Sequence, residues 1–248
     1  MEIKRVNLGE KRPTPIVRIK NLSKSYGKNE VLKNVSVDLM KGHIIGLLGP
    51  NGCGKTSLLK IISGLINDYS GTVLVNGRKP DEVTKSMVAY LPERTYLPDW
   101  MKPKDAIKYF ADFYKDFDSK KAYKMAETFQ LPLDQKIKTM SKGQQEKLQL
   151  ILVMSRNAIL YLLDEPLGGV DPASRSFILD VIMKNYANNS TVLMSTHLIH
   201  DVEYAFDRVL MIGRGSVLVN SDTQAITDNG KTVEDLFKEV FQYAWEVN

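Results

Sequence analysis

The sequence has few of the features that mark secreted or membrane-spanning proteins. Its 248 residues include one cysteine, Cys53, so no disulfide can form within the chain, and a reducing compartment fits. No apolar run approaches the roughly eighteen residues that a transmembrane helix needs. Residues 1–15 are polar and lack the apolar core of a signal peptide. We therefore expect a cytoplasmic protein, whose place at a membrane would depend on a partner.

A strong excess of one charge is also missing. The chain has 34 basic and 29 acidic residues, a net charge of +5, and the two signs are interspersed. No basic block is dense enough to indicate a nucleic-acid interface, so we expect no nucleic-acid partner. The mild positive charge leaves two interpretations open, a weak preference for an anionic membrane surface and an ordinary solvated surface.

Hydrophobic residues make up 43% of the chain, enough for a core in one large domain or in one domain with a subdomain. Apolar runs and alternation predict strands at residues 16–22, 35–40, 43–49, 71–77, 87–91, 158–166, 191–197 and 208–218. Helical spacing predicts helices at residues 56–65, 103–130 and 232–247. Strands that alternate with helices indicate an α/β sheet. A helical block at about residues 100–156 interrupts the alternation and indicates an inserted subdomain, and we expect a flexible leader at residues 1–14.

The segment GPNGCGKT matches the phosphate-loop pattern G-x-x-x-x-G-K-[ST] and lies between a predicted strand and a predicted helix. Its glycines let consecutive backbone N–H groups curl around phosphate oxygens, and the helix N-terminus adds its positive end. Lys55 would reach the outer phosphates, and the Thr56 hydroxyl would hold Mg²⁺. We expect a nucleoside triphosphate to contact Gly49, Pro50, Asn51, Gly52, Cys53, Gly54, Lys55, Thr56 and Ser57.

Cys53 lies inside this loop and has two interpretations. A thiol near a helix N-terminus can have a lowered pKa and react readily when the site is empty. The plainer interpretation, which we favour, is a small side chain that tolerates close packing.

An acidic pair and a histidine follow two later strands. Asp164 and Glu165 end an apolar strand at the edge where α/β sheets bind ligands, and their side chains should point to opposite sides. Asp164 would bind Mg²⁺, whereas Glu165 would orient and deprotonate the attacking water. His197 ends the next strand and could touch the γ-phosphate. His200 lies three residues further on, but no ligand cluster supports a metal pair with it.

The stretch TMSKGQQEKLQ at residues 139–149 starts a helix in an unusual way. Ser141 and Gln144 form an S-x-x-Q capping box. This box does not explain Gly143, which weakens the first turn, or Lys142, whose charge opposes the helix dipole. Both residues make sense if an anion docks at this helix end, because glycine permits close backbone approach.

Together these segments resemble the ATPase subunit of ATP-binding-cassette (ABC) transporters, from about Ile16 to Asp222. The resemblance rests on SKSYG with Tyr26, GPNGCGKT, YLPE, SKGQQ, LLDEP, GGVD and STH, in the family's order and spacing. It implies a P-loop NTPase core at residues 15–222, with a mixed sheet, helices on both faces and an antiparallel β element near the N-terminus. Residues 223–248 would add a C-terminal helical extension.

The resemblance also implies functions for particular residues. Tyr26 would stack on adenine, and Ser141, Gly143 and Gln144 would receive the γ-phosphate of an ATP held by a second ATPase subunit, in a head-to-tail dimer around two Mg-ATP. Glu93 stands where the family usually has a glutamine that reaches toward Mg²⁺. This glutamate is similar to that of exporters whose permease is a separate chain, which would place the protein on the inner face of the plasma membrane.

The segment joining the sheet to the helical block would receive a short helix of the permease in this family. Tyr96, Trp100 and Met101 are suitable apolar anchors. The other interpretation is that they pack inside the subdomain, as we expect of Phe110, Phe113, Tyr114 and Phe117. The tail helix, with Leu236, Phe237, Val240 and Phe241, should pack on the sheet or on a partner.

Other functions remain as alternatives to a transport ATPase. An ABC ATPase that acts on DNA or ribosomes would carry a long coiled-coil insertion or two cassettes, and this chain has neither. A P-loop kinase or GTPase would lack the SKGQ and STH segments. An ATPase that works mechanically on a signalling or cell-division membrane protein stays open.

Overall fold

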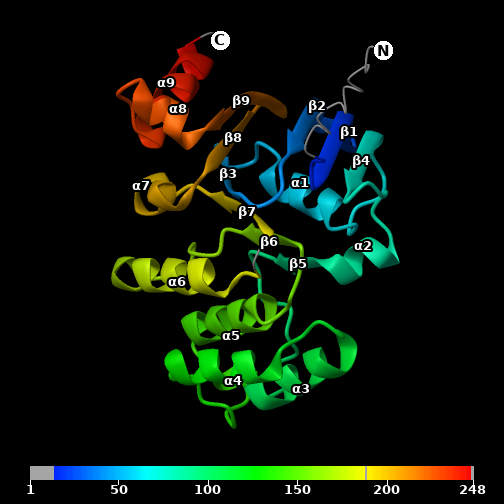
Figure 1. Ribbon diagram of the computed structural model, residues 1–248, viewed down its shortest axis with the longest axis vertical. Helices are drawn as coiled ribbons and strands as arrows, with labels where there is room; N and C mark the ends of the chain where they lie inside the picture. Colours follow the sequence, from blue (N-terminus) through cyan, green and yellow to red (C-terminus); the bar gives the residue numbers. More distant parts are fainter. Residues whose placement is uncertain (1–13, 188, 247–248) are drawn as a thin grey trace, which may run out of the picture.

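The computed structural model describes residues 14–187 and 189–246, so the predicted leader lies almost entirely outside the described residues. Two β-sheets form the centre of the fold (Figure 1). The smaller sheet has the order β2-β1-β4 and is antiparallel, with β1 at Val17–Tyr26, β2 at Asn29–Leu39 and β4 at Ser70–Val75. This sheet is the antiparallel element expected near the N-terminus.

The larger sheet has the order β5-β6-β7-β3-β8-β9. The first five strands run parallel, and β9 pairs antiparallel with β8. Its strands are β3 (Ile44–Leu48), β5 (Val88–Leu91), β6 (Leu160–Asp164), β7 (Thr191–Thr196), β8 (Arg208–Gly213) and β9 (Ser216–Asp222). Every residue of β3, β6 and β7 is buried, as expected for central parallel strands covered on both faces. The sheet is therefore mixed, and the expected fold class is confirmed.

Helix α1 (Lys55–Ile62) lies between the two sheets (Figure 1). Its apolar side chains join one core cluster with inward residues of the small sheet and with one face of the large sheet. Because the helix is covered from both sides, most of its residues are buried rather than a single stripe. This packing holds the loop between β3 and α1 at the carboxyl edge of the large sheet.

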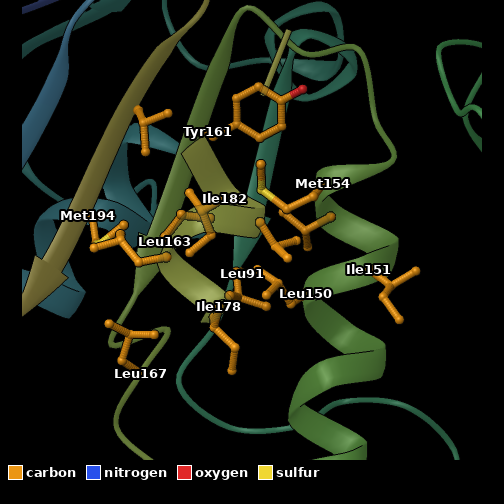
Figure 2. Packing of buried hydrophobic residues seen from close by; sticks show 14 of the residues in the cluster. Leu91, Leu150, Ile151, Met154, Tyr161, Leu163, Leu167, Ile178, Ile182 and Met194 are labelled. Carbon is orange, nitrogen blue, oxygen red and sulfur yellow. The ribbon is translucent and has the colours of Figure 1, made fainter. Parts of the chain in front are cut away.

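The opposite face of the large sheet packs against α5 (Lys142–Met154) and α6 (Pro172–Asn185). Figure 2 shows this layer, in which Leu91, Leu163 and Met194 of the strands face residues of the two helices, among them Leu150, Met154, Ile178 and Ile182. Tyr161 is fully buried there, and its hydroxyl donates to the Arg156 carbonyl at 2.6 Å. The second core thus holds α5 against the sheet through the C-terminal half of the helix.

Helices α3 (Pro103–Phe113) and α4 (Ser119–Thr128) lie with α5 at one end of the molecule (Figure 1). The helix predicted over residues 103–130 is thus two helices. The helical conformation is interrupted at residues 114–118. The Asp118 side chain caps the start of α4 by accepting from the Lys121 N–H, and the Asp118 N–H donates to the Ser155 carbonyl. The contact between Asp118 and Ser155 joins segments far apart in the sequence, so the local pattern could not predict this interruption.

Short and terminal helices complete the fold. The sequence pattern did not predict helix α2 (Glu82–Met87). This helix begins with a capping box between Asp81 and Thr84. Further helices are α7 (Ile199–Val202), α8 (Thr223–Asp228) and α9 (Val233–Glu246), with 3₁₀ turns at Ile137–Thr139 and Glu203–Ala205. Phe241 of α9 packs on β8 at Gly213, so the tail helix packs on the sheet. Among the helices of the described chain, none combines the length and the apolar character that crossing a bilayer requires.

Candidate functional site

A cleft of about 970 Å³ opens at the carboxyl ends of β3, β6 and β7. Such an edge is where open α/β sheets bind ligands. The cleft brings together most of the residues predicted from the sequence. Its lining includes Tyr26, Asn51, Gly52, Gly54, Lys55, Thr56, Ser57, Glu93, Asp164, Glu165 and His197.

The loop before α1 has a shape that depends on its glycines. Gly54 caps the helix with φ 106°, and a Cβ there would lie 2.9 Å from the Val31 carbonyl oxygen. A Cβ on Gly49 would lie 2.2 Å from the Ile212 carbonyl oxygen. Both positions therefore exclude side chains. The backbone of the loop stays accessible between them, as a phosphate cradle requires.

Lys55 is the buried cation of this loop. Its side chain is 7% exposed, and its Nζ donates to the Gly49 carbonyl at 2.8 Å and the Pro50 carbonyl at 3.3 Å. The same Nζ lies 3.8 Å from Glu165 Oε1. The ammonium group thus lies inside the cradle, where phosphate oxygens would be stronger acceptors than carbonyls.

Cys53 is buried in the core between the two sheets, at 6% exposure. Burial raises the pKa of its thiol, and the nearby Lys55 charge offsets only part of this effect. The structure therefore supports the packing interpretation of Cys53 over the reactive one.

Asp164 is buried, at 1% exposure, and its carboxylate accepts hydrogen bonds from three hydroxyl groups. Ser195 donates at 2.7 Å, Thr56 at 3.1 Å and Tyr90 at 3.5 Å. Burial raises the pKa of the Tyr90 phenol, and the negative charge of Asp164 raises it further. A buried carboxylate held by neutral donors is electrostatically suited to a cation.

Mg²⁺ prefers hard oxygen ligands, and the Thr56 hydroxyl and Asp164 carboxylate provide two at the mouth of the phosphate cradle. In the described part of the chain, no group of three His, Cys, Asp or Glu residues is placed to hold a metal. Glu93 is exposed on the cleft wall and does not join Asp164 and Glu165 in such a group. The residues therefore fit Mg²⁺ held by one or two protein oxygens together with substrate phosphates, which is its usual mode.

Glu165 follows Asp164 but has different partners. Its backbone lies in the left-handed region at φ 49°, and its N–H donates to Ser195 Oγ at 3.0 Å. A non-glycine residue held there costs about 1–3 kcal/mol, and such strain concentrates at functional sites. The turn carries the carboxylate into the cleft, where Oε2 lies 2.9 Å from His197 Nδ1. The two acidic residues thus have different partners in the structure, and their separate functions stay a prediction.

Tyr26 ends β1 at the rim of the cleft and is 49% exposed. Its hydroxyl lies 3.3 Å from Ser57 Oγ, so the ring is attached to the first turn of α1. A half-exposed aromatic ring beside a phosphate cradle offers a stacking surface for a base.

The start of α5 has the predicted capping box. The Gln144 N–H donates to Ser141 Oγ at 3.2 Å, and the Ser141 N–H donates to Gln144 Oε1 at 2.9 Å. A Cβ on Gly143 would meet no atom of the described chain within 4 Å. Packing within the chain therefore does not require this glycine. Ser141, Gly143 and Gln144 do not line the cleft, whereas Lys142 does, and its side chain is 81% exposed.

Among the residues without a predicted function, Glu146 and Gln149 line the cleft, and Ser195 and Tyr90 donate hydrogen bonds to Asp164. Ser195 forms hydrogen bonds with both Asp164 and Glu165. These bonds depend on the pairing of β6 with β7, which the sequence alone does not predict. Gln149 is 2% exposed, and its Oε1 has no hydrogen-bond partner among the described residues. A polar residue within the apolar run of α5 was the signal that could have identified it.

A second concave surface, of about 1050 Å³, lies between β5 and α3. Trp100 is 70% exposed there, and Tyr96 and Tyr109 are about half exposed. The expectation that Phe113 packs inside the helical block is wrong, because its ring is 66% exposed and stacks on Tyr109 at 6.1 Å. Its position on α3 faces outward, and the inward stripe of the helix is already filled. The residues that do pack inward are Met101, Phe110, Tyr114 and Phe117.

Comparisons with known proteins agree with this geometry. The sequence model of a family described as "ABC transporter" matches residues 32–168. The uncharacterized ABC transporter ATP-binding protein MJ1023 of Methanocaldococcus jannaschii is 32% identical over 89% of this chain and 86% of its own length. The lantibiotic transport ATP-binding protein SrtF of Streptococcus pyogenes is 27% identical over 90% of this chain and 96% of its own.

Solved structures show the same fold. A structure of the ATP-binding subunit of an ABC transporter superposes with a TM-score of 0.82 and 24% identity, covering 91% of this chain and 99% of the other. The dimeric structure of MJ0796, a bacterial ABC transporter cassette, has a TM-score of 0.74 and 22% identity, covering 83% and 98%. These likenesses extend over nearly the whole described chain.

Proposed function

The chain belongs to the ABC transporter family of ATP-binding proteins, and from that premise we propose that it hydrolyses Mg-ATP in a head-to-tail dimer and drives a separate permease. The observation that carries the proposal is the arrangement at one sheet edge. There Lys55 lies in a phosphate cradle, Asp164 is paired with Thr56, and Glu165 is paired with His197. Binding, charge compensation and water activation each have a group within one cleft.

The phosphates of ATP would bind in the loop of residues 49–57. Lys55 would exchange the carbonyls of Gly49 and Pro50 for the outer phosphate oxygens, because anionic acceptors form stronger bonds. Thr56 and Asp164 would hold Mg²⁺, and we propose Glu93, on the wall of the same cleft, as a further oxygen ligand. When bound, Mg²⁺ neutralises charge on the phosphate oxygens and orients them. Tyr26 would stack on the adenine ring.

Glu165 is the proposed general base. Its carboxylate would accept a proton from water as the water oxygen attacks the γ-phosphorus and the bond to ADP breaks. His197 holds this carboxylate at 2.9 Å, and Ser195 fixes the backbone behind it. His197 would also contact the γ-phosphate. Because both neighbours constrain Glu165, the base is oriented before substrate binds.

The start of α5 supports the dimer part of the proposal. Gly143 has open space above it, and the helix N-terminus there offers N–H groups to an anion. We propose that Ser141, Gly143 and Gln144 receive the γ-phosphate held by the phosphate loop of a second ATPase subunit, either another copy or a relative. The exposed Lys142 would add a positive charge to this contact.

The aromatic groove formed by Tyr96, Trp100, Tyr109 and Phe113 supports a permease partner. Exposed apolar surface of this kind indicates an interaction site, and a short amphipathic helix is a suitable occupant. Closure of the ATPase dimer would then move this groove and the permease helix with it. Since a relative is named for lantibiotic transport, we propose export, with the chain in the cytoplasm on the inner face of the plasma membrane.

The permease proposal is tested by affinity purification of the chain from detergent-solubilised native membranes. We expect a polytopic membrane protein in stoichiometric amount with the wild type and its loss with the double substitution Trp100→Ser and Phe113→Ser. Tyr204→Ser is the matched control, because Tyr204 is also 66% exposed but lies outside the groove. Recovery of soluble proteins or nucleic acid alone would contradict a transport function.

A further inference from the structure

Strand β1 carries an unusual residue beside the proposed base-binding ring. Its inward side chains are apolar at Val17, Ile19 and Leu22, and the next buried position is Lys24, at 4% exposure. A lysine is almost never fully buried unless it is paired. Its burial beside a ligand cleft therefore calls for a partner and a reason.

The partner of Lys24 is Asp68, in the connection between α1 and β4. Lys24 Nζ donates to the Asp68 carbonyl oxygen at 2.9 Å and to its carboxylate at 2.5 Å. The Lys24 side chain is 3% exposed, whereas that of Asp68 is 83% exposed. The hydrogen bond from Lys24 lowers the pKa of the Asp68 carboxyl group. These two bonds fix the ammonium group in one place.

That place is over the ring of Tyr26. Lys24 Nζ lies 4.6 Å from the ring centroid, within the range of a cation–π contact. The Tyr26 hydroxyl is held at the other end by Ser57. The ammonium group occupies one face of the ring, so a stacking ligand must use the other face. The ring remains 49% exposed and lines the cleft, so a face is open for stacking.

We propose that Lys24 is a positioning residue for the nucleotide base, which fixes the plane of Tyr26 and draws π-electron density from it. Adenine is an electron-rich ring, and it stacks better on an aromatic ring whose electron density a cation has reduced. A ring already held in place also loses less conformational entropy on binding. This inference rests on the proposed ATP-binding role of the cleft and concerns affinity for the base, not the chemical step.

Lys24→Met tests this function by comparing ATP with tripolyphosphate, which can occupy the phosphate loop but has no base. Methionine keeps the length and packing of the side chain and removes the charge. We expect the Kd for ATP to rise about three- to tenfold, with unchanged affinity for tripolyphosphate and unchanged kcat at saturating Mg-ATP. Lys20→Met, on an exposed position of the same strand, is the matched control and should change none of these values.

A purely structural function for Lys24 predicts a different result. Equal weakening of ATP and tripolyphosphate, or no change in either with a folded variant, would overturn the proposal. In a Tyr26→Leu background, Lys24→Met should cause no further loss of ATP affinity, and a full additional loss would overturn it as well.

If Lys24→Met fails to fold, Asp68→Asn is a second test, because the Asp68 side chain is exposed and its substitution disturbs packing less. We expect a smaller loss of ATP affinity, again without an effect on tripolyphosphate, and an unchanged ATP affinity would contradict the proposal. A wild-type chain that binds ATP but does not hydrolyse it would contradict the proposed ATPase mechanism instead. The change in affinity for ATP relative to tripolyphosphate in the Lys24→Met variant would then still test the function of Lys24.

Discussion

The phosphate loop and the start of α5 differ in how much of their structure is explained by contacts within the chain. Around the loop, each functional side chain has a partner within the chain. Asp164 is buried under three hydroxyls, and Glu165 lies between Lys55 and His197. At the start of α5, Gly143 faces open space and Lys142 is 81% exposed. The first region is organised by its own fold. In the second, Lys142 pairs with Glu146 Oε1 at 3.6 Å, whereas packing within the described chain does not require the glycine at position 143.

The largest expected effect comes from the organised region. Glu165→Gln removes the proposed base but keeps the shape of the side chain and a polar group near His197. We expect turnover to fall by about 10²–10⁴-fold, with ATP affinity retained. Hydrolysis of radiolabelled ATP and equilibrium binding would measure the two quantities in one preparation. Near-normal turnover would remove Glu165 as the base.

A smaller effect of a different kind is expected from Gly143→Ala. Because a Cβ there meets nothing within the described chain, alanine should stabilise α5, raising the free energy of unfolding by up to about 1 kcal/mol. If another subunit's phosphate approaches this backbone, ATPase activity should nevertheless fall, by about tenfold. Chemical denaturation and a steady-state assay would measure the two changes. Higher stability with full activity would show that no close approach occurs at Gly143.

The smallest expected effect concerns Cys53, within the organised region. Since burial raises the pKa of its thiol, little thiolate is present at neutral pH, and the fraction grows only at higher pH than for an ordinary cysteine. We expect iodoacetamide to modify the folded chain at least about tenfold more slowly than the chain in guanidinium chloride. Equal rates would show that the loop opens readily and that its organisation is weaker than described.

The same contrast explains what the sequence could predict. The loop, the acidic pair and His197 were placed correctly at one sheet edge, because each directly follows an apolar strand and parallel strands bring such ends together. The capping box of Ser141 and Gln144 was also predicted, since it depends on spacing alone. Local patterns therefore gave the positions of most site residues, while their functional roles and the domain boundaries stay predictions.

Contacts between distant parts of the chain were not predictable from the pattern. The Ser195 hydroxyl donates to Asp164 across 31 residues of sequence, and the N–H of Glu165, whose backbone is left-handed, donates to the same serine. The outward position of Phe113 and the break between α3 and α4 also depend on tertiary packing. Lys24 is a further example, because an alternating strand pattern predicts an apolar residue at its buried position.

In the proposed dimer, the phosphate loop of one chain works with α5 of another, and mixing two inactive variants is the sharpest test of this arrangement. Lys55→Met disables the loop and leaves the α5 start intact, whereas Gly143→Asp does the reverse. In a head-to-tail dimer, a mixed pair contains one intact loop facing one intact α5 start. We predict that each variant alone is inactive and that an equal mixture recovers roughly a quarter of wild-type ATPase activity. No recovery from a mixture shown to form mixed dimers would contradict a site shared between two chains.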